Sequence, residues 1–306
     1  CKADRPEQVS SIKTREITRL YKKKKMTRAI ENEFDGVDQL DLLHCPACDL
    51  SYFYPLLPGS GSYYETMQTW GYYVHEKYEY KLAAGFLKNA PNVLEVGCGN
   101  GIFPGYLDSG TYTGLDINER AVRECREKGL NVIGQPVEEH AREHPEHYDA
   151  VCCFQVLEHV ADPAGFLSHC IAALKKGGRL IVSVPAYDSY LRYVSNAILN
   201  IPPHHVTLWS DKALTNLARL MGLNLEQLIH EPLQDVHVKR YAATAVKMSL
   251  IGEHSKKANV ANSAKGNKLL DAFSYLLSIP VQRGLKKQPL KPHGHTVLAV
   301  YNKPGQ

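Results

Sequence analysis

The stretch that decides the fold is Asn92-Val93-Leu94-Glu95-Val96-Gly97-Cys98-Gly99-Asn100-Gly101. Its first half has the pattern of a buried strand, and glycines follow at 97, 99 and 101. Residues 102–107 then have a helical pattern. Glycine is needed in such a turn because the backbone takes positive φ and because a ligand must approach the backbone itself. A strand, a glycine turn and a helix in this order predict the phosphate or nucleoside corner of a doubly wound α/β fold.

The spacing of the glycines selects among the ligands of such folds. A dinucleotide fingerprint, G-x-G-x-x-G, would place its third small residue at Ile102, which disfavours a nicotinamide dehydrogenase. The pattern is instead G-x-G-x-G, with an acid two positions before the first glycine. It resembles motif I of the class I S-adenosylmethionine (SAM) methyltransferases, which read E/D-x-G-x-G-x-G. The SAM-binding residues implied by this resemblance are Glu95, Gly97, Cys98, Gly99 and Gly101.

The rest of the chain alternates between short apolar strands and helices. We expect strands over 93–96, 112–115, 130–133, 148–154, 179–184, 223–229 and 296–301. We expect helices over 72–87, 119–128 and 212–221. A further helix is expected to begin at Asp162-Pro163, which supply an N-cap acid and a first-turn proline. The predicted fold class is α/β, a doubly wound Rossmann-like sheet of seven strands. Its last strand is expected to be antiparallel and to form an edge.

Two positions beyond the glycine turn are expected to contact the nucleoside part of SAM. Asp116 ends the second strand, nineteen residues after the first glycine of the turn, where an acid accepts both ribose hydroxyls. Ile117 follows it. Gln135, Pro136 and Val137 stand where methyltransferases usually place an acid-rich loop against adenine. Because an amide replaces the usual Asp, we expect an amide or backbone contact there.

Further cofactor contacts are expected before the first strand and after the fourth. Phe154 and Gln155 end the fourth strand, at the same edge of the sheet. An aromatic stripe over 72–87 predicts a helix packed on the sheet. Since this segment leads to the glycine turn, Tyr73 or Lys77 could reach the carboxylate of the cofactor.

The resemblance to SAM methyltransferases covers residues 93–184 with every element in order. Within that family, the stretch Gln155-Val156-Leu157-Glu158-His159 most resembles the quinone-biosynthesis O-methyltransferases and their relatives. Some of these carry E-x-x-E-H, and the two carboxylates and the histidine hold a divalent cation. Gln155 replaces the first carboxylate here, and a neutral amide is a poor ligand for a hard cation. We therefore expect metal-independent transfer, with Glu158 and His159 acting through hydrogen bonds.

The segment 201–210 is stiffened by two prolines and carries His204 and His205. It leaves the carboxyl end of the fifth strand, where open α/β sheets bind ligands. Methyl transfer from a sulfonium is an in-line displacement, so the protein must chiefly align donor and acceptor. A histidine can take the proton of the acceptor. We expect His159 and one of His204 or His205 to do so, and the other to bond only the backbone.

Residues 1–60 form the expected N-terminal segment, which we predict to be helical and basic over 1–44. His44-Cys45-Pro46-Ala47-Cys48 follows, and its C-x-x-C is half of a zinc knuckle. A structural zinc site needs four ligands. Many bacterial methyltransferases begin with a C-x-x-C…C-x-x-C ribbon, and this segment resembles one whose first pair has become Cys1…Asp4. The alternatives are a vestigial knuckle and a zinc site that includes Cys45, Cys48 and Cys1.

The net charge of +4 is unevenly distributed. Lys and Arg outnumber Asp and Glu by ten to seven in residues 1–40 and by twelve to two in 239–306, whereas 41–238 have fourteen against twenty-three. The three segments thus carry +3, +10 and −9. The basic end suggests a phospholipid, a phosphorylated substrate or nucleic acid as partner, or simply a solvated tail. A zinc-ribbon nucleic-acid-binding protein on this scaffold is a rival function, but we expect no nucleic acid.

The expected division of the chain places the SAM-binding domain at 61–231, a helical basic insertion at 232–294 and the last strand at 295–306. The insertion is too long for an ordinary connection. Its apolar pieces flanked by cations suit a membrane surface or a lipophilic pocket, and a lid is the alternative. No apolar run reaches the roughly 18 residues of a membrane span, and the cysteine pattern favours a cytoplasmic setting.

The function that these features predict is SAM-dependent methyl transfer to an oxygen, or a nitrogen, of a small or lipid-linked acceptor. Peripheral contact with an anionic membrane is part of this prediction. The ribbon-like start also resembles that of sugar-nucleotide C-methyltransferases. A sugar or sugar-nucleotide acceptor, methylated at carbon or oxygen, is therefore the alternative.

Overall fold

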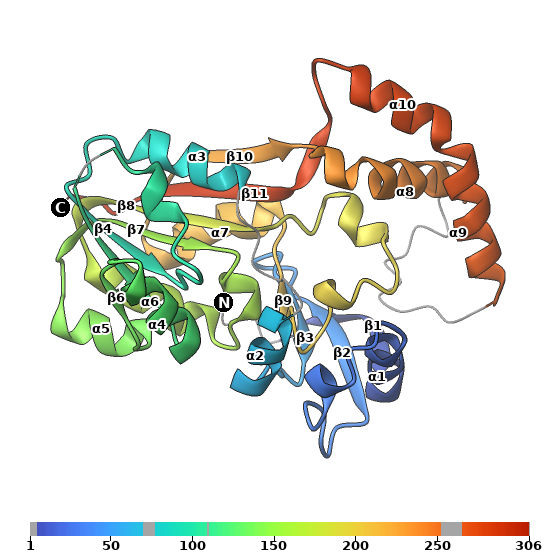
Figure 1. Cartoon of the computed structure of the whole chain (residues 1–306), viewed down its shortest axis with the longest axis horizontal. Coiled ribbons are helices and arrows are strands. Elements are labelled where there is room, and N and C mark those ends of the chain that lie inside the picture. The colour runs from blue at the N-terminus through green and yellow to red at the C-terminus, as the bar shows by residue number, and fades with distance from the viewer. Residues whose placement is uncertain (1–4, 70–76, 109, 252–264, 306) are drawn as a thin grey trace.

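The computed structural model describes residues 5–69, 77–108, 110–251 and 265–305. Its centre is a seven-stranded sheet in the order β10-β11-β8-β7-β4-β5-β6 (Figure 1). The strands are β4 Asn92–Val96, β5 Thr111–Leu115, β6 Val132–Ile133, β7 Tyr148–Phe154, β8 Leu174–Pro185, β10 Asn224–Pro232 and β11 His293–Asn302. β4 to β8 are parallel, and the chain order reverses at β4, between β5 and β7. Ligands of open α/β sheets bind at such a reversal, outside the carboxyl ends of the strands.

The predicted seven-stranded α/β sheet with an antiparallel last strand is confirmed. β11 runs antiparallel to both of its neighbours, β8 and β10. Its expected place at the edge was wrong, because β10 forms that edge. The burial explains the order: residues 296–301 are buried on both faces, as an interior strand must be, whereas most of β10 is only partly covered.

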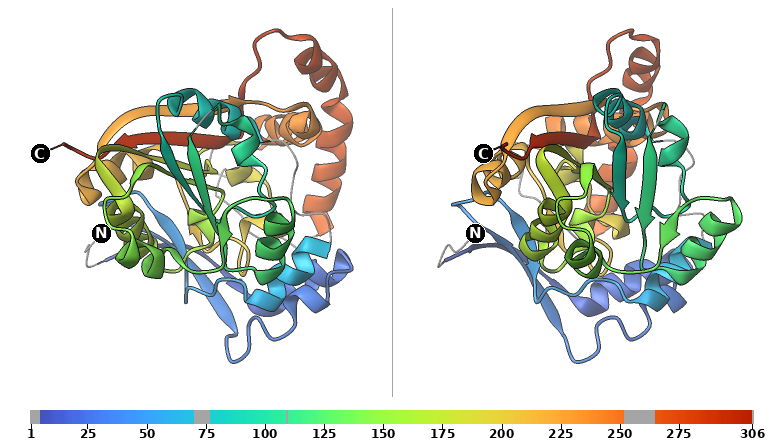
Figure 2. Two further views of the ribbon diagram at one scale, coloured as in Figure 1. Left: turned by 60° about the vertical axis from the view of Figure 1, so that its left-hand side comes forward. Right: turned by 90° about the vertical axis from the view of Figure 1, so that its left-hand side faces the viewer.

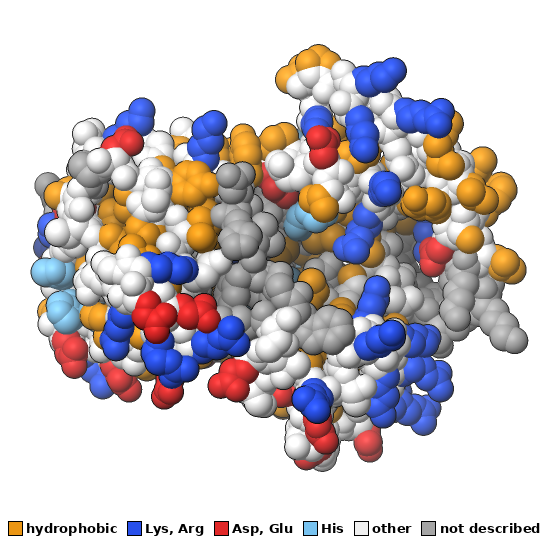
Figure 3. Space-filling model, in the orientation of Figure 1, with side chains coloured by type: hydrophobic (Ala, Val, Ile, Leu, Met, Phe, Trp, Pro, Cys, Tyr) orange, Lys and Arg blue, Asp and Glu red, His pale blue; other side chains and the backbone are white. Residues whose placement is uncertain are grey.

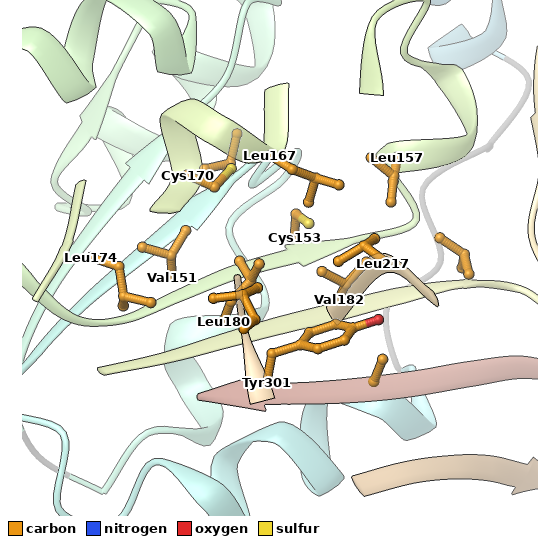
Figure 4. Close-up of a cluster of buried hydrophobic side chains, with 14 of the residues drawn as sticks. Val151, Cys153, Leu157, Leu167, Cys170, Leu174, Leu180, Val182, Leu217 and Tyr301 are labelled. Atoms are coloured by element: carbon orange, nitrogen blue, oxygen red, sulfur yellow. The ribbon is translucent and has the colours of Figure 1, made fainter. Parts of the chain in front are cut away.

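Alternate side chains of β7 enter two hydrophobic cores on opposite faces of the sheet. Val151 and Cys153 pack with residues of α5, α6 and α7 (Figure 4). Ala150, Cys152 and Phe154 pack with α3 and the short helix η2. Figure 2 shows helices on both sides of the sheet. The α-helices of this part are α3 Tyr78–Phe86, α4 Glu119–Glu127, α5 Val137–Glu143, α6 Pro163–Ala173 and α7 Asp211–Met221.

The predicted N-cap of α6 is confirmed, and α7 has an N-cap of the same kind. Asp162 accepts a hydrogen bond from the Gly165 amide at the start of α6, and Ser210 accepts one from Ala213 at the start of α7. Gly222 ends α7 in the left-handed conformation. Residues 103–106 form a 3₁₀ turn instead of a regular helix. Of the helix predicted over 72–87, residues 78–86 lie within α3, and residues 72–76 lie outside the described residues. The 3₁₀ helices are η1 Arg28–Ile30, η2 Phe103–Tyr106, η3 Leu157–His159, η4 Tyr190–Tyr193, η5 Ile198–Asn200 and η6 Asp235–His237.

Within residues 5–44, which the structure describes, the chain forms two strands of a small antiparallel sheet, so the helix predicted over 1–44 was wrong there outside α1, Thr14–Lys23. The sheet has the order β1-β2-β3-β9, with β1 Glu7–Lys13, β2 Gln39–His44, β3 Ser51–Tyr54 and β9 Thr207–Leu208. In β2, Leu40 and Leu42 are buried while their neighbours are partly exposed, which is the period of a strand. Because β9 lies within the segment 201–210, just after His204 and His205, this sheet supports the two histidines.

The segment between β10 and β11 forms η6 and three α-helices in the part that the structure describes. The α-helices are α8 Val238–Leu250, α9 Lys265–Leu277 and α10 Ile279–Lys287, which stand together beyond one end of the large sheet in Figure 1. A further helix, α2 Gly61–Thr69, precedes α3. None of the described helices has the length and apolar character that crossing a membrane requires.

Candidate cofactor and acceptor site

The glycine turn after β4 has the conformation that its sequence predicts. Gly97, Gly99 and Gly101 all have positive φ. A Cβ atom at Gly97 would come within 2.5 Å of Val156 Cγ2, and one at Gly101 within 2.5 Å of Leu130 Cδ1. The turn therefore excludes any larger residue at these two positions by both conformation and space.

Asp116 lies beside this turn and is bonded to it. One carboxylate oxygen accepts from the Gly99 amide at 2.8 Å, and the other accepts from the Asn118 amide at 2.8 Å. A carboxylate has about four acceptor sites, so each oxygen can still accept a ribose hydroxyl. The next residue, Ile117, is 76% exposed at the edge of the sheet, where an apolar side chain can cover one face of adenine.

Glu95 is buried beneath the turn and accepts a hydrogen bond of 2.5 Å from the Tyr112 hydroxyl. Burial raises its pKa to about 8, and the Tyr112 bond and the charge of Lys77 oppose that rise. Lys77 is the N-cap residue of α3. Its charge acts on Glu95 beneath the glycine turn, and a residue that binds the cofactor carboxylate must lie near that turn. Tyr73 lies outside the described residues.

The expected adenine loop is held by a chain of side-chain contacts. The Gln135 amide nitrogen lies 3.1 Å from His140 Nδ1, and His140 Nε2 lies 2.6 Å from the Tyr148 hydroxyl. Pro136 is the N-cap of α5, and Val137 is buried. The amide nitrogen of Gln135 is thus used internally, which leaves its oxygen as the natural acceptor for an exocyclic amine.

The two residues that end β7 differ in what they offer the cofactor. Phe154 is buried against Phe103, with ring centroids 4.7 Å apart, so its side chain belongs to the core. Gln155 has φ +57° and directs its amide nitrogen towards Glu79 Oε1, at 3.3 Å. A non-glycine residue at positive φ is uncommon and is often found at functional sites.

Glu158 is a fully buried carboxylate among three histidines. Neither of its oxygens has a hydrogen-bond partner among the described residues. Its Oε1 lies 3.9 Å from Nε2 of His159 and 3.9 Å from Nε2 of His205. Burial raises its pKa to about 8, with Lys77 acting in the opposite direction. Burial likewise lowers the pKa of His159 to about 4 and that of His204 and His205 well below the usual value.

The structure distinguishes His204 from His205, which the sequence could not. His204 Nδ1 lies 3.1 Å from the Tyr63 hydroxyl, and its carbonyl oxygen lies 2.5 Å from His159 Nδ1. Tyr63 is in turn bonded to Tyr21 in the core of the N-terminal segment. His204 therefore joins the N-terminal segment to the β7 edge.

His205 faces a cavity that opens beyond the carboxyl end of β8. Glu158 and His205 line it together with Tyr187, Arg192 and Asn200. Of the histidines expected to take the acceptor proton, His205 therefore faces this space, which is bounded by residues from the segment after β8. We call this space the candidate acceptor cavity.

A divalent cation held as in the relatives with E-x-x-E-H does not fit this arrangement. Gln155 is engaged with Glu79, so Glu158 is the one carboxylate that faces the histidines among the described residues. Mg²⁺ prefers oxygen ligands. Nitrogen atoms of His159, His204 and His205 lie within 4.8 Å of one another, and such a set favours softer cations.

Activity should survive exhaustive treatment with a chelator, because the carboxylate pair that a hard cation needs is absent. The measurement is turnover before and after chelation, followed by addition of Mg²⁺ or Zn²⁺. Loss of turnover that either ion restores would show that the histidine cluster holds a metal.

A zinc site in the N-terminal segment, one of the two alternatives there, finds no support. Among the described residues, the histidine cluster is the one group of three or more metal-binding side chains, and it does not include Cys45 or Cys48. Both cysteines are buried in a tight turn closed by the Asp49 amide and the Cys45 carbonyl. Cys1 lies outside the described residues.

Several residues of the site were not predicted. Glu79 is buried on α3 and meets Gln155, and Tyr63 holds His204. An acid inside the aromatic stripe Tyr78-Glu79-Tyr80 was the available signal for Glu79. No local pattern indicated Tyr63, because its partner lies 141 residues away in the chain.

Comparison with known proteins agrees with a methyltransferase fold. A family model described as a methyltransferase domain matches residues 70–228, more than half of the chain. Ubiquinone biosynthesis O-methyltransferases of Klebsiella pneumoniae and Yersinia pestis are each 39% identical over 99 residues. Those matches cover 30% of this chain and 41% of each relative, so the chain spans about two fifths of the length of these relatives.

Solved structures of methyltransferases are also similar. A SAM-dependent methyltransferase from Archaeoglobus fulgidus matches 79% of this chain and all of its own, with 17% identity and a TM-score of 0.47. Magnesium protoporphyrin IX methyltransferase from Synechocystis PCC 6803 matches 50% of this chain and 75% of its own, with 19% identity and a TM-score of 0.40.

The sheet order, the glycine turn with Asp116 and the family match together define a class I SAM methyltransferase fold. The chain belongs to the family of SAM-dependent methyltransferases. Its cofactor is SAM.

Proposed function

We propose that this chain transfers the methyl group of SAM to an oxygen, or a nitrogen, of a small or lipid-linked acceptor, with His205 as the base. The observation that supports this most is the shared cavity of Glu158 and His205 beside the β7 edge. SAM, when bound, supplies a methyl group on a positively charged sulfur, which leaves as a neutral thioether.

His205 can take the acceptor proton because burial keeps its imidazole neutral. The imidazolium formed would lie 3.9 Å from Oε1 of Glu158. Because burial raises the pKa of Glu158 to about 8, this carboxyl group stabilises the imidazolium only where it is ionised, which favours turnover at mildly alkaline pH. As the acceptor oxygen loses its proton to His205, it forms its new bond to the methyl carbon. His159 and His204 hold the segment that carries His205, through the bond between the His159 ring and the His204 carbonyl.

Comparing extracts of cells that produce the wild-type chain with those that produce a His205→Asn variant tests this proposal. A compound, or a lipid, should gain a methyl-sized mass only with the wild type. Identical extracts, from cells in which both proteins are folded and bind SAM, would contradict it.

The lipid-linked acceptor is proposed because of the exposed face of α9 and α10. Large apolar side chains on these helices are exposed, up to 75% for Leu269 and 62% for Leu276. Figure 3 shows hydrophobic and basic side chains side by side over these helices. A lid packed on the domain would bury such residues, whereas α10 uses Leu285 to pack on α8 and leaves the others outside. Apolar side chains flanked by cations suit the surface of an anionic bilayer.

The protein should float together with anionic vesicles at low salt and should no longer float with them at high salt. Each Lys or Arg near such a surface contributes about 1 kcal/mol, and this attraction is screened by salt. Leu269→Asp with Leu276→Asp should abolish flotation, and Leu220→Asp, at an exposed position on α7, should not. Protein that stays soluble with anionic and neutral vesicles at both salt concentrations would favour a lid and a soluble sugar or phenol acceptor.

A further inference from the structure

A second groove lies between α8, α9 and the residues that follow η4. Its volume is about 440 Å³, and its polar lining includes Lys239, Arg240, Lys247, Asp271 and Ser274. None of these residues takes part in the cofactor site or the acceptor cavity. The groove is therefore separate from both of those sites.

The charges of this groove are only partly balanced. Lys247 pairs with Asp271 at 2.6 Å. Lys239 and Arg240 form no ion pair with any described residue. They stand in the first turn of α8, which contains no acid. Cations at a helix N-terminus meet the positive end of the helix dipole. An anion bound at this end of α8 would interact favourably with both cations and with the helix dipole.

Ser274 supplies an independent sign of a ligand. It is only 1% exposed, it lines the groove, and its hydroxyl has no hydrogen-bond partner among the described residues. Ser278, which follows α9 and is the N-cap of α10, instead donates to the Tyr275 carbonyl. A buried hydroxyl without a partner costs free energy. A hydrogen bond from Ser274 to an acceptor oxygen in the groove would offset that cost.

The groove adjoins the acceptor cavity. Val194 lines both spaces, with Arg192 on the cavity side and Tyr193 on the groove side. The segment 191–195 thus forms a shared wall. A molecule whose reactive group lies at His205 could extend past this wall into the groove.

We propose that this groove binds the phosphate or diphosphate group of the methyl acceptor. Phosphate oxygens accept hydrogen bonds and donate none, which matches the Arg240 guanidinium, the Lys239 ammonium and the Ser274 hydroxyl. Polyprenyl-linked and nucleotide-linked acceptors share this group. The inference rests on the proposed function, because it concerns the acceptor of the same reaction.

Calorimetric titration with inorganic pyrophosphate tests the groove without any knowledge of the acceptor. Lys239→Gln with Arg240→Gln should weaken pyrophosphate binding by at least about tenfold, the loss of charge-assisted hydrogen bonds. Lys286→Gln with Lys287→Gln removes the same charge from exposed positions on α10 and should change binding less than twofold. Equal binding by all three proteins, or an equal loss in both variants, would overturn the proposal.

Ser274→Ala separates a ligand contact from a structural role. It should weaken pyrophosphate binding several-fold while leaving the melting temperature unchanged or higher, because the hydroxyl has no partner to lose. A lower melting temperature with unchanged binding would contradict the proposal.

Farnesyl diphosphate and uridine diphosphate then distinguish the two sources of the phosphate. Tighter binding of the first than of pyrophosphate assigns a lipid-linked acceptor, and tighter binding of the second assigns a nucleotide-linked one. If neither binds more tightly than pyrophosphate, the groove does not serve the acceptor. Titration of the same variants with SAM should show unchanged affinity, so failure here is distinct from failure of the methyltransferase function.

Discussion

Replacing His205 by asparagine should lower turnover by about 10²–10⁴-fold, the usual contribution of a general base. SAM affinity should stay intact, because His205 faces the acceptor cavity rather than the glycine turn. Turnover at saturating SAM and a separate calorimetric SAM titration measure the two effects.

His204→Asn is the matched control, since it removes the adjacent ring. His204 contacts Tyr63, which belongs to the buried network of the N-terminal segment. Its loss should cost about 1–3 kcal/mol of stability, as for a broken buried hydrogen bond, with a smaller effect on turnover. If both variants retain full turnover, alignment of the reactants alone drives the reaction and no histidine acts as base. A large loss of turnover in His204→Asn alone would reverse the two roles.

Replacing Asp116 by alanine should weaken SAM binding by about 1.5–3 kcal/mol, or roughly 10- to 150-fold. The variant loses the acceptor for the ribose hydroxyls, and it also releases the Gly99 amide from its bond to the carboxylate. Calorimetric titration with SAM measures the change.

Asp149→Ala provides the control for that experiment. Asp149 lies near the opposite end of β7 from the site and pairs with Lys175. This substitution should leave SAM affinity unchanged. Equal affinities of wild type and Asp116→Ala would show that the ribose lies elsewhere.

The conformation of the glycine turn and the place of Asp116 could be predicted from the sequence because their determinants are local. Each residue expected to bind SAM there follows its strand directly, as Gly97 follows β4 and Asp116 follows β5. Positive φ after a buried strand strongly favours glycine, so the turn is visible in the sequence itself.

The acceptor side could not be predicted to the same depth because its contacts are non-local. The assignment of His204 depends on Tyr63, and β9 pairs with β3 across more than 150 residues. No periodicity records such pairings. The helix predicted over 1–44 failed for a related reason, since its strands are defined by partners within a small sheet.

The interior position of β11 in the sheet and the contacts of Gln155 also could not be predicted from the sequence. A fully apolar strand indicates burial on both faces but not which neighbour takes the edge. The change from Glu to Gln at 155 showed that a carboxylate was missing. That Glu79 receives the amide depends on how α3 packs on the sheet.

Calorimetric titration of the wild-type chain with SAM, its demethylated product and NADH tests the central conclusion most directly. The glycine spacing, the bond between Asp116 and the Gly99 amide, and the family match predict that SAM and its product bind. They also predict no measurable heat with NADH. Binding of NADH by a protein that ignores both SAM and its product would contradict the assignment.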